Sequence, residues 1–267
     1  MIGLGVAAFF YKTLVVEAAE SIVLDKLIAD FDYMVFSDFW RIHGSAFTPV
    51  WLAALAVGVL YFLINIFMVG GIFYQYKYGD SGFRFKAFVK SGFSLLGKYL
   101  LLGVIVFSIG SVVVLFSVIF FFLFVKIAEG GNERTYILWM IPPSLLLVLI
   151  LSVLAVVADY ARYLIFKNRA LNPISGFTEG VSFVFKNFRT IGFYWLIVAV
   201  SLLIGLLYLL LDTIIGMRSE VTIVLMMIIQ QTVIFGRIFL KNWHYAFVHI
   251  FSENKSVLLP SKPSGVD

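Results

Sequence analysis

The chain has 267 residues, of which 62% are hydrophobic and 13% charged, with a formal net charge of +5 and no cysteine. This composition excludes an ordinary soluble globular protein, which needs more polar residues to cover its surface. The missing cysteines exclude disulfides and thiolate metal sites. The basic residues stand at the ends of apolar runs, which is typical of membrane topology signals. We therefore expect membrane lipids as partners and no nucleic acid.

The first 46 residues contain no ordinary membrane span. Residues 2–10 are apolar but too few to cross a bilayer before Lys12 and Glu17. We predict an atypical sixth helix here, which either is the end of a longer span or crosses obliquely up to Leu24. Residues 21–44 carry apolar side chains at helical spacing with aspartates between them. This pattern predicts an amphipathic helix on the outer surface of the membrane.

Residues 47–251 contain five apolar runs that exceed the roughly 20 residues a helix needs to cross a bilayer. The runs are 47–76, 97–125, 136–167, 191–216 and 221–251. The strands of a membrane barrel alternate apolar and polar residues, and these runs do not. The predicted fold class is all-α: a polytopic transmembrane helical bundle with interfacial amphipathic helices. Residues 252–267 are predicted to be a flexible cytoplasmic tail.

Lysine and arginine are concentrated in alternate connections, after the first and third of these runs and after the last. The positive-inside rule then places these connections and the C-terminus in the cytoplasm, and residues 130–135 outside. We expect a multi-pass protein of the inner (plasma) membrane.

Two basic, aromatic-rich stretches, residues 83–98 and 177–189, precede spans on the cytoplasmic side. Such stretches typically lie in the interface and attract anionic headgroups. The predicted headgroup contacts are Arg84, Lys86, Lys90, Lys98, Lys186 and Arg189.

Residues 47–125 and 136–216 share one order of segments: a span, a basic loop, a Ser-Gly-Phe triplet, an amphipathic stretch and a second span. Parallel repeats of this kind occur in transporters. A true duplication and a common way of building helical bundles both account for the pattern.

Four segments carry a resemblance to a known family: Val69-Gly70-Gly71-Ile72, Asp159-Tyr160-Ala161-Arg162, residues 180–189 and residues 231–237. Together they resemble an uncharacterised family of bacterial polytopic membrane proteins, distantly similar to the membrane domain attached to some glycerophosphodiester phosphodiesterases. The resemblance covers about residues 47–250. It implies a six-helix bundle and no catalysis, because the chain has no segment for the catalytic barrel.

Polar residues inside the spans form the candidate site. Gln230, Arg237 and Lys241 lie on one stripe of the last run, together with His244, while Asp159 and Arg162 share a face of the third. Charges at this depth usually pair or line a cavity. We predict that Asp159 approaches Arg237, with Arg162 nearby. Either the pair pins two helices structurally or the residues line a polar cavity for a solute or lipid headgroup.

No phosphate loop, zinc signature or dinucleotide fingerprint occurs, so no cofactor and no catalytic residue is predicted. His43 is expected on the opposite side of the membrane from His244 and His249, which argues against a metal site. These features favour a non-enzymatic scaffold or accessory subunit that contacts other membrane proteins. The alternative is a transporter or lipid-handling protein that uses a polar site near Asp159, Arg162 and Arg237.

Overall fold

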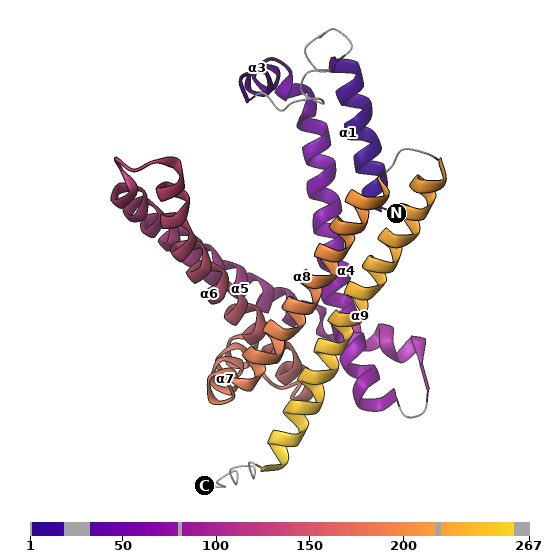
Figure 1. Cartoon of the computed structure of the whole chain (residues 1–267). Coiled ribbons are helices and arrows are strands. Elements are labelled where there is room, and N and C mark those ends of the chain that lie inside the picture. Colours follow the sequence, from indigo (N-terminus) through magenta and orange to yellow (C-terminus); the bar gives the residue numbers. More distant parts are fainter. Residues whose placement is uncertain (1, 19–32, 80–81, 217–219, 259–267) are drawn as a thin grey trace. The chain divides into compact units, whose positions relative to one another are not determined.

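The computed structural model describes residues 2–18, 33–79, 82–216 and 220–258. Within these ranges the secondary structure is helical and contains no strand, which confirms the all-α prediction (Figure 1). Five segments are long and apolar enough to cross a membrane, so this is an integral membrane protein. The chain divides into two compact units, Met1–Ile66 and Phe67–Asp267.

The first unit is built around one phenylalanine. It contains α1 (Ile2–Ala18), α3 (Tyr33–His43), the short 3-10 helix η1 (Gly44–Phe47) and the first part of α4 (Thr48–Tyr78). Phe47 is buried, and its ring lies 5.4 Å from that of Phe10 and 5.5 Å from that of Trp40. These contacts join α1, α3 and η1.

Both N-terminal predictions are met in part. α1 supplies a helix where a sixth one was predicted, with 17 residues instead of a full span. α3 covers the second part of the predicted amphipathic helix at 21–44, and residues 19–32 lie outside the described residues.

The second unit contains the end of α4 and five further helices: α5 (Phe85–Ala128), α6 (Glu133–Lys167), α7 (Pro173–Lys186), α8 (Arg189–Ile215) and α9 (Glu220–Leu258). α5 has 44 residues and is therefore about 66 Å long, well over the roughly 30 Å of a hydrocarbon core. Its first turns contain most of the basic, aromatic-rich stretch at 83–98 that was predicted to lie in the interface. This stretch and the predicted span at 97–125 form one helix, which continues unbroken through residue 97.

α9 also runs further than predicted. The predicted flexible tail begins at residue 252, but the helix continues to Leu258 and Ser252 is buried. Residues 259–267 lie outside the described residues.

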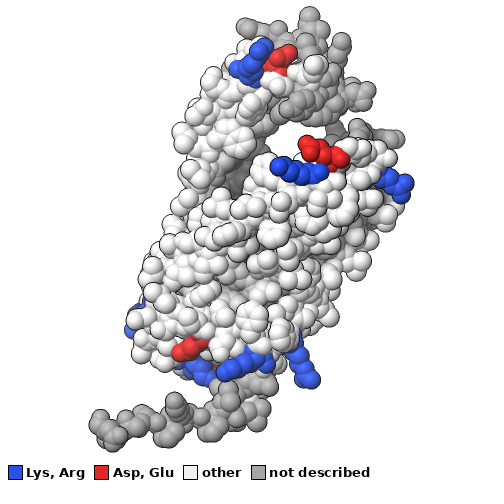
Figure 2. Space-filling model, turned by 90° about the vertical axis from the view of Figure 1, so that its left-hand side faces the viewer, with Lys and Arg blue, Asp and Glu red and all other residues white. Residues whose placement is uncertain are grey.

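The buried side chains of the second unit gather where the predicted cytoplasmic ends of its helices meet. They come from the end of α4, the start of α5, the end of α6, α7, the start of α8 and the C-terminal part of α9. We call this region the end core, and its largest fully buried members are Phe73, Leu95, Tyr99, Leu102, Val156, Tyr160, Tyr163, Ile165, Val184, Thr190 and Val248. The other halves of α5, α6, α8 and α9 leave most of their apolar side chains exposed, as expected for lipid contact. Figure 2 shows the charged side chains of the visible surface in a few groups, with uncharged side chains over most of it.

Small residues allow two close helix approaches in the end core. A Cβ on Gly92 of α5 would lie 2.8 Å from the carbonyl oxygen of Phe67 in α4, and Ser91 donates a hydrogen bond of 3.1 Å to the carbonyl of Gly70. On α7, a Cβ on Gly180 would lie 3.0 Å from the carbonyl oxygen of Val157 in α6. This is the close backbone packing typical of membrane helices.

The two copies of the suggested repeat differ in local structure. Gly82 of the first copy lies in the connection before α5 with φ of 88°, which favours glycine. Gly176 of the second copy is buried inside α7, where a Cβ would meet Ile165 at 2.6 Å. A single helix, α5, therefore occupies the place that α7 and α8 share in the second copy.

α8 and α9 form an antiparallel pair. α8 ends at Ile215, and the next residue, Gly216, has a φ of 61°, which favours glycine. The rings of Phe193 and Phe247 stack at 3.7 Å, and a Cβ on Gly236 would lie 3.8 Å from Ile204. The residue numbers on the two helices thus run in opposite directions in a constant register.

Candidate functional site

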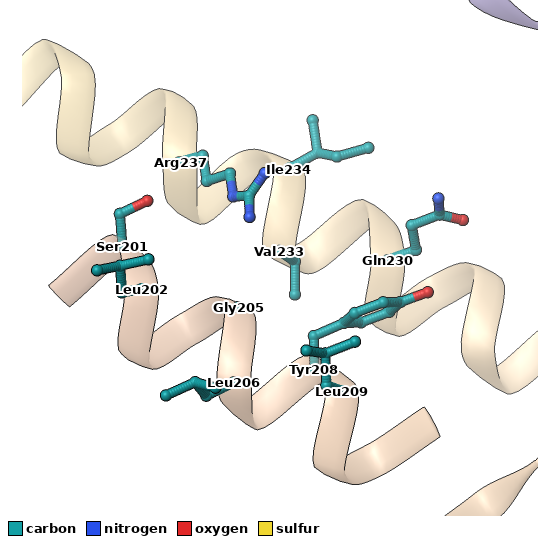
Figure 3. A pocket seen from close by; sticks show the side chains of 10 residues that line it. All are labelled: Ser201, Leu202, Gly205, Leu206, Tyr208, Leu209, Gln230, Val233, Ile234 and Arg237. Atoms are coloured by element: carbon teal, nitrogen blue, oxygen red, sulfur yellow. The ribbon is translucent and has the colours of Figure 1, made fainter. Parts of the chain in front are cut away.

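A cavity of about 440 Å³ lies between α8 and α9 (Figure 3). Four polar side chains line it: Ser201 and Tyr208 from α8, and Gln230 and Arg237 from α9. The remaining lining consists of Gly205 and five aliphatic side chains. In Figure 3 Tyr208 reaches from α8 toward the turn of α9 that carries Gln230.

Arg237 extends into the space that Gly205 leaves open. A Cβ at position 205 would lie 3.5 Å from its Nη2 atom, so a larger residue there would meet the guanidinium. Arg237 makes no hydrogen bond or ion pair with any residue that the structure describes. It stands level with Ser201, which lies about 18 Å along the axis of α8 from Arg189 and about 21 Å from Ile215. Its charge is therefore near the middle of the span.

Asp159 lies in a different place, on the inner face of α6 in the end core. Its Oδ1 accepts a hydrogen bond of 2.7 Å from Arg162 Nη1, one turn further along α6. Its Oδ2 lies 3.1 Å from His244 Nε2 of α9. The three side chains are between 7% and 19% exposed, so this is a buried, charge-assisted contact between two helices.

The cluster of Asp159, Arg162 and His244 has further basic and aromatic side chains beside it. Lys241, one turn before His244, lies within electrostatic range of the Asp159 carboxylate. The ring of Tyr194 from α8 lies 5.6 Å from that of His244. Arg162 Nε and His244 Nδ1 are buried without a hydrogen-bond partner among the described residues.

A second network joins α6 and α9 closer to the predicted cytoplasmic surface. Tyr163 Oη donates a hydrogen bond of 2.6 Å to Glu253 Oε1, and Lys167 Nζ lies 3.3 Å from Glu253 Oε2. His249 Nδ1 lies 3.0 Å from the same tyrosine hydroxyl. These contacts hold the ends of the two helices together.

The predicted approach of Asp159 to Arg237 is wrong. Asp159 pairs with Arg162 and His244, whereas Arg237 lies in the cavity together with Gln230. The predicted polar set is therefore divided between two places, with Lys241 beside the Asp159 cluster. The role of His244 was missed, although it lies seven residues after Arg237 and so on the same face of α9.

The predicted headgroup contacts are mostly exposed side chains. Arg84, Lys86 and Lys90 lie exposed at the start of α5, Lys186 at the end of α7 and Arg189 at the start of α8. Lys98 differs, because its Nζ donates to the carbonyl oxygens of Arg169 and Leu171 in the connection after α6. Lys98 therefore has a structural contact within the chain, which differs from the predicted contact with lipid headgroups.

The described residues contain no group of three or more His, Cys, Asp or Glu side chains that would hold a metal ion. No protein-family model, curated protein or solved structure matches the chain. The suggested resemblance to the bacterial membrane family stays a prediction, and function has to be argued from the geometry.

Proposed function

We propose that this integral membrane protein is a lipid-handling protein that binds an anionic amphiphile, with the anionic headgroup at Arg237 in the cavity between α8 and α9. The observation that supports this is a guanidinium near mid-span that has no partner among the described residues. A centrally placed arginine is unfavourable by about 2.5 to 3.5 kcal/mol on insertion scales. An interface about 18 Å away is beyond the reach of its side chain, so snorkelling does not relieve the charge. An anionic headgroup would neutralise it.

The composition of the cavity fits such a ligand. Its volume of about 440 Å³ lies within the usual range of about 300 to 1,000 Å³ for ligand pockets. Aliphatic walls from both helices surround a few polar groups, which is how pockets for amphiphiles orient a polar head. Leu206, on the wall, is 64% exposed, so an acyl chain beside it would remain in hydrocarbon.

The amino-acid sequence favoured a scaffold or accessory subunit, and a lipid-handling role was the alternative. The cavity supports the alternative, because a protein that works only by contact has no need for a charged residue in an open space at mid-depth. The Asp159 cluster, by contrast, fits the structural reading, since its charges are paired across α6 and α9.

The lipids that remain with the purified protein test this proposal. We expect the full chain, purified in mild detergent, to retain phosphatidylglycerol in preference to phosphatidylcholine. Arg237→Gln should lower that preference about tenfold, the effect of losing a hydrogen bond to a charged group. Arg237→Lys keeps the charge and should retain most of it. Arg134→Gln is the matched control, because it removes an exposed basic residue at the start of α6, away from the cavity. Equal lipid ratios in Arg237→Gln and in the unchanged protein would contradict the proposal.

The orientation is part of the same proposal: the end core and the C-terminus face the cytoplasm, where anionic lipids and basic residues attract each other. The chain has no cysteine, so single cysteines report on it directly. An impermeant thiol reagent added to intact cells should label Gly131→Cys and leave Lys255→Cys unlabelled. Labelling of Lys255→Cys without labelling of Gly131→Cys would mean that the end core and the C-terminus face outward.

A further inference from the structure

Polar side chains recur at intervals of seven residues on both helices of the α8–α9 pair. On α8 they are Tyr194, Ser201 and Tyr208, and on α9 they are Gln230, Arg237 and His244. Positions seven apart return to within about 20° of the same face of a helix. Each set therefore forms one stripe along its helix.

The antiparallel register brings the two stripes together as three rungs. Tyr194 lies opposite His244, with ring centroids 5.6 Å apart. Ser201 and Arg237 line one end of the cavity, and Tyr208 and Gln230 line the other (Figure 3). We call these three pairs the polar ladder.

The polar ladder covers most of a membrane's thickness. Seven residues of helix rise about 10 Å, so the three rungs extend over about 20 Å. The hydrocarbon core of a bilayer is roughly 30 Å thick. Between the middle and outer rungs the walls are aliphatic, and the flanking side chains of Leu202, Leu206 and Ile234 are exposed.

We propose that the polar ladder is a path along which the phosphate-bearing headgroup of an anionic lipid moves between the two leaflets while its acyl chains stay in the surrounding hydrocarbon. This inference rests on the proposed binding at Arg237 and adds movement to it. The middle and outer rungs offer hydroxyl, amide and guanidinium groups that replace part of the water around a phosphate. The inner rung offers the hydroxyl of Tyr194, because His244 is buried against Asp159. The middle rung carries the positive charge at the depth where an anion meets the largest barrier.

The positions of the other charges agree with an anionic cargo. Lys241 lies on α9 between the middle and inner rungs, and Arg162 is held beside the inner rung by Asp159. Among the described residues, Asp159 is the carboxylate beside the inner rung. It already contacts Arg162 and His244. A cationic headgroup would find no comparable partner at the middle rung.

Reconstituted vesicles test the inference. The full chain is placed in vesicles of phosphatidylcholine and phosphatidylglycerol that contain tail-labelled fluorescent phosphatidylglycerol, and a membrane-impermeant reductant bleaches the outer leaflet. With the unchanged protein we expect bleaching to proceed to the inner-leaflet label, and without protein to stop at about half. The double variant Tyr208→Phe with Gln230→Leu removes the outer rung and leaves Arg237 in place. It should slow the movement at least about tenfold.

The control and the contradicting outcomes separate this inference from the binding proposal. Thr213→Val with Thr232→Val removes two hydroxyls from the same two helices outside the cavity, and it should leave the movement unchanged. No bleaching of inner label by the unchanged protein, or equal rates in the outer-rung variant, would overturn the ladder even if retention at Arg237 holds. Vesicles that enclose a phosphate sensor provide the last arm: entry of inorganic phosphate without lipid movement would overturn the lipid assignment.

Discussion

The end core and the middle of the α8–α9 pair differ in whether their charged side chains have described partners, although α9 runs through both. In the end core, α6 lies against α9, and Asp159 meets both Arg162 and His244 within 3.1 Å. At mid-span, α9 faces α8 across an open cavity, and Arg237 meets no described partner. Dense packing of several helices supplies counter-charges, whereas a pair of helices with aliphatic walls does not. The paired charges therefore stabilise the fold, and the charge at mid-span is available to a ligand.

The largest effect should come from breaking the buried pair. Asp159→Asn leaves Arg162 without its counter-charge and weakens the contact with His244, and the free energy of unfolding should fall by about 3 kcal/mol. Arg237→Gln removes a charge that has no described partner, so it should not lower the free energy of unfolding. Thermal unfolding in detergent measures both.

The double variant of Asp159 and Arg237 sharpens this prediction. Because the two side chains lie in different places, their effects should add to within about 0.5 kcal/mol. A larger coupling energy would mean that the two residues meet after all.

A smaller effect is expected when a methyl group is added to a glycine in each region. Gly92→Ala places a Cβ 2.8 Å from the Phe67 carbonyl oxygen, so α4 and α5 must move apart, with a loss of about 1 to 3 kcal/mol. Gly205→Ala meets only the end of the Arg237 side chain at 3.5 Å, an ordinary contact. Its stability should be unchanged or higher by up to about 1 kcal/mol, because alanine favours helix. Equal losses in the two variants would show that the α8–α9 cavity is as tightly packed as the end core.

The smallest effect concerns the network near the predicted cytoplasmic surface. Glu253 is partly exposed, so water screens its contacts with Tyr163 and Lys167. Glu253→Gln and Tyr163→Phe should each lower the free energy of unfolding by about 1 kcal/mol, with the double variant losing less than the sum. A loss in Glu253→Gln as large as that in Asp159→Asn would remove the distinction between these two sets of contacts.

Much of the fold followed from local pattern. Runs of apolar residues longer than a bilayer is thick predict helices wherever they occur, because an unpaired backbone is too unfavourable in hydrocarbon. The bounds of the predicted spans agree closely with α4, α6 and α8. In α5 and α9 the helix continues beyond its most apolar run, where hydropathy drops. The pattern therefore placed the start of α5 and the end of α9 at the wrong residue.

The candidate site divides in the same way. The amino-acid sequence by itself determined which side chains are polar inside spans and which share a helix face, including the spacing of Gln230, Arg237 and His244. Only the tertiary structure decided which of them meet, because a stripe on one helix does not specify the neighbour it faces. The close approach of α6 to α9 brings Asp159 into contact with His244, and the α8–α9 register places Arg237 beside Gly205. Which side chains meet depends on how the helices pack, and residues distant in the chain contribute to that packing. Local periodicity therefore does not determine the partners.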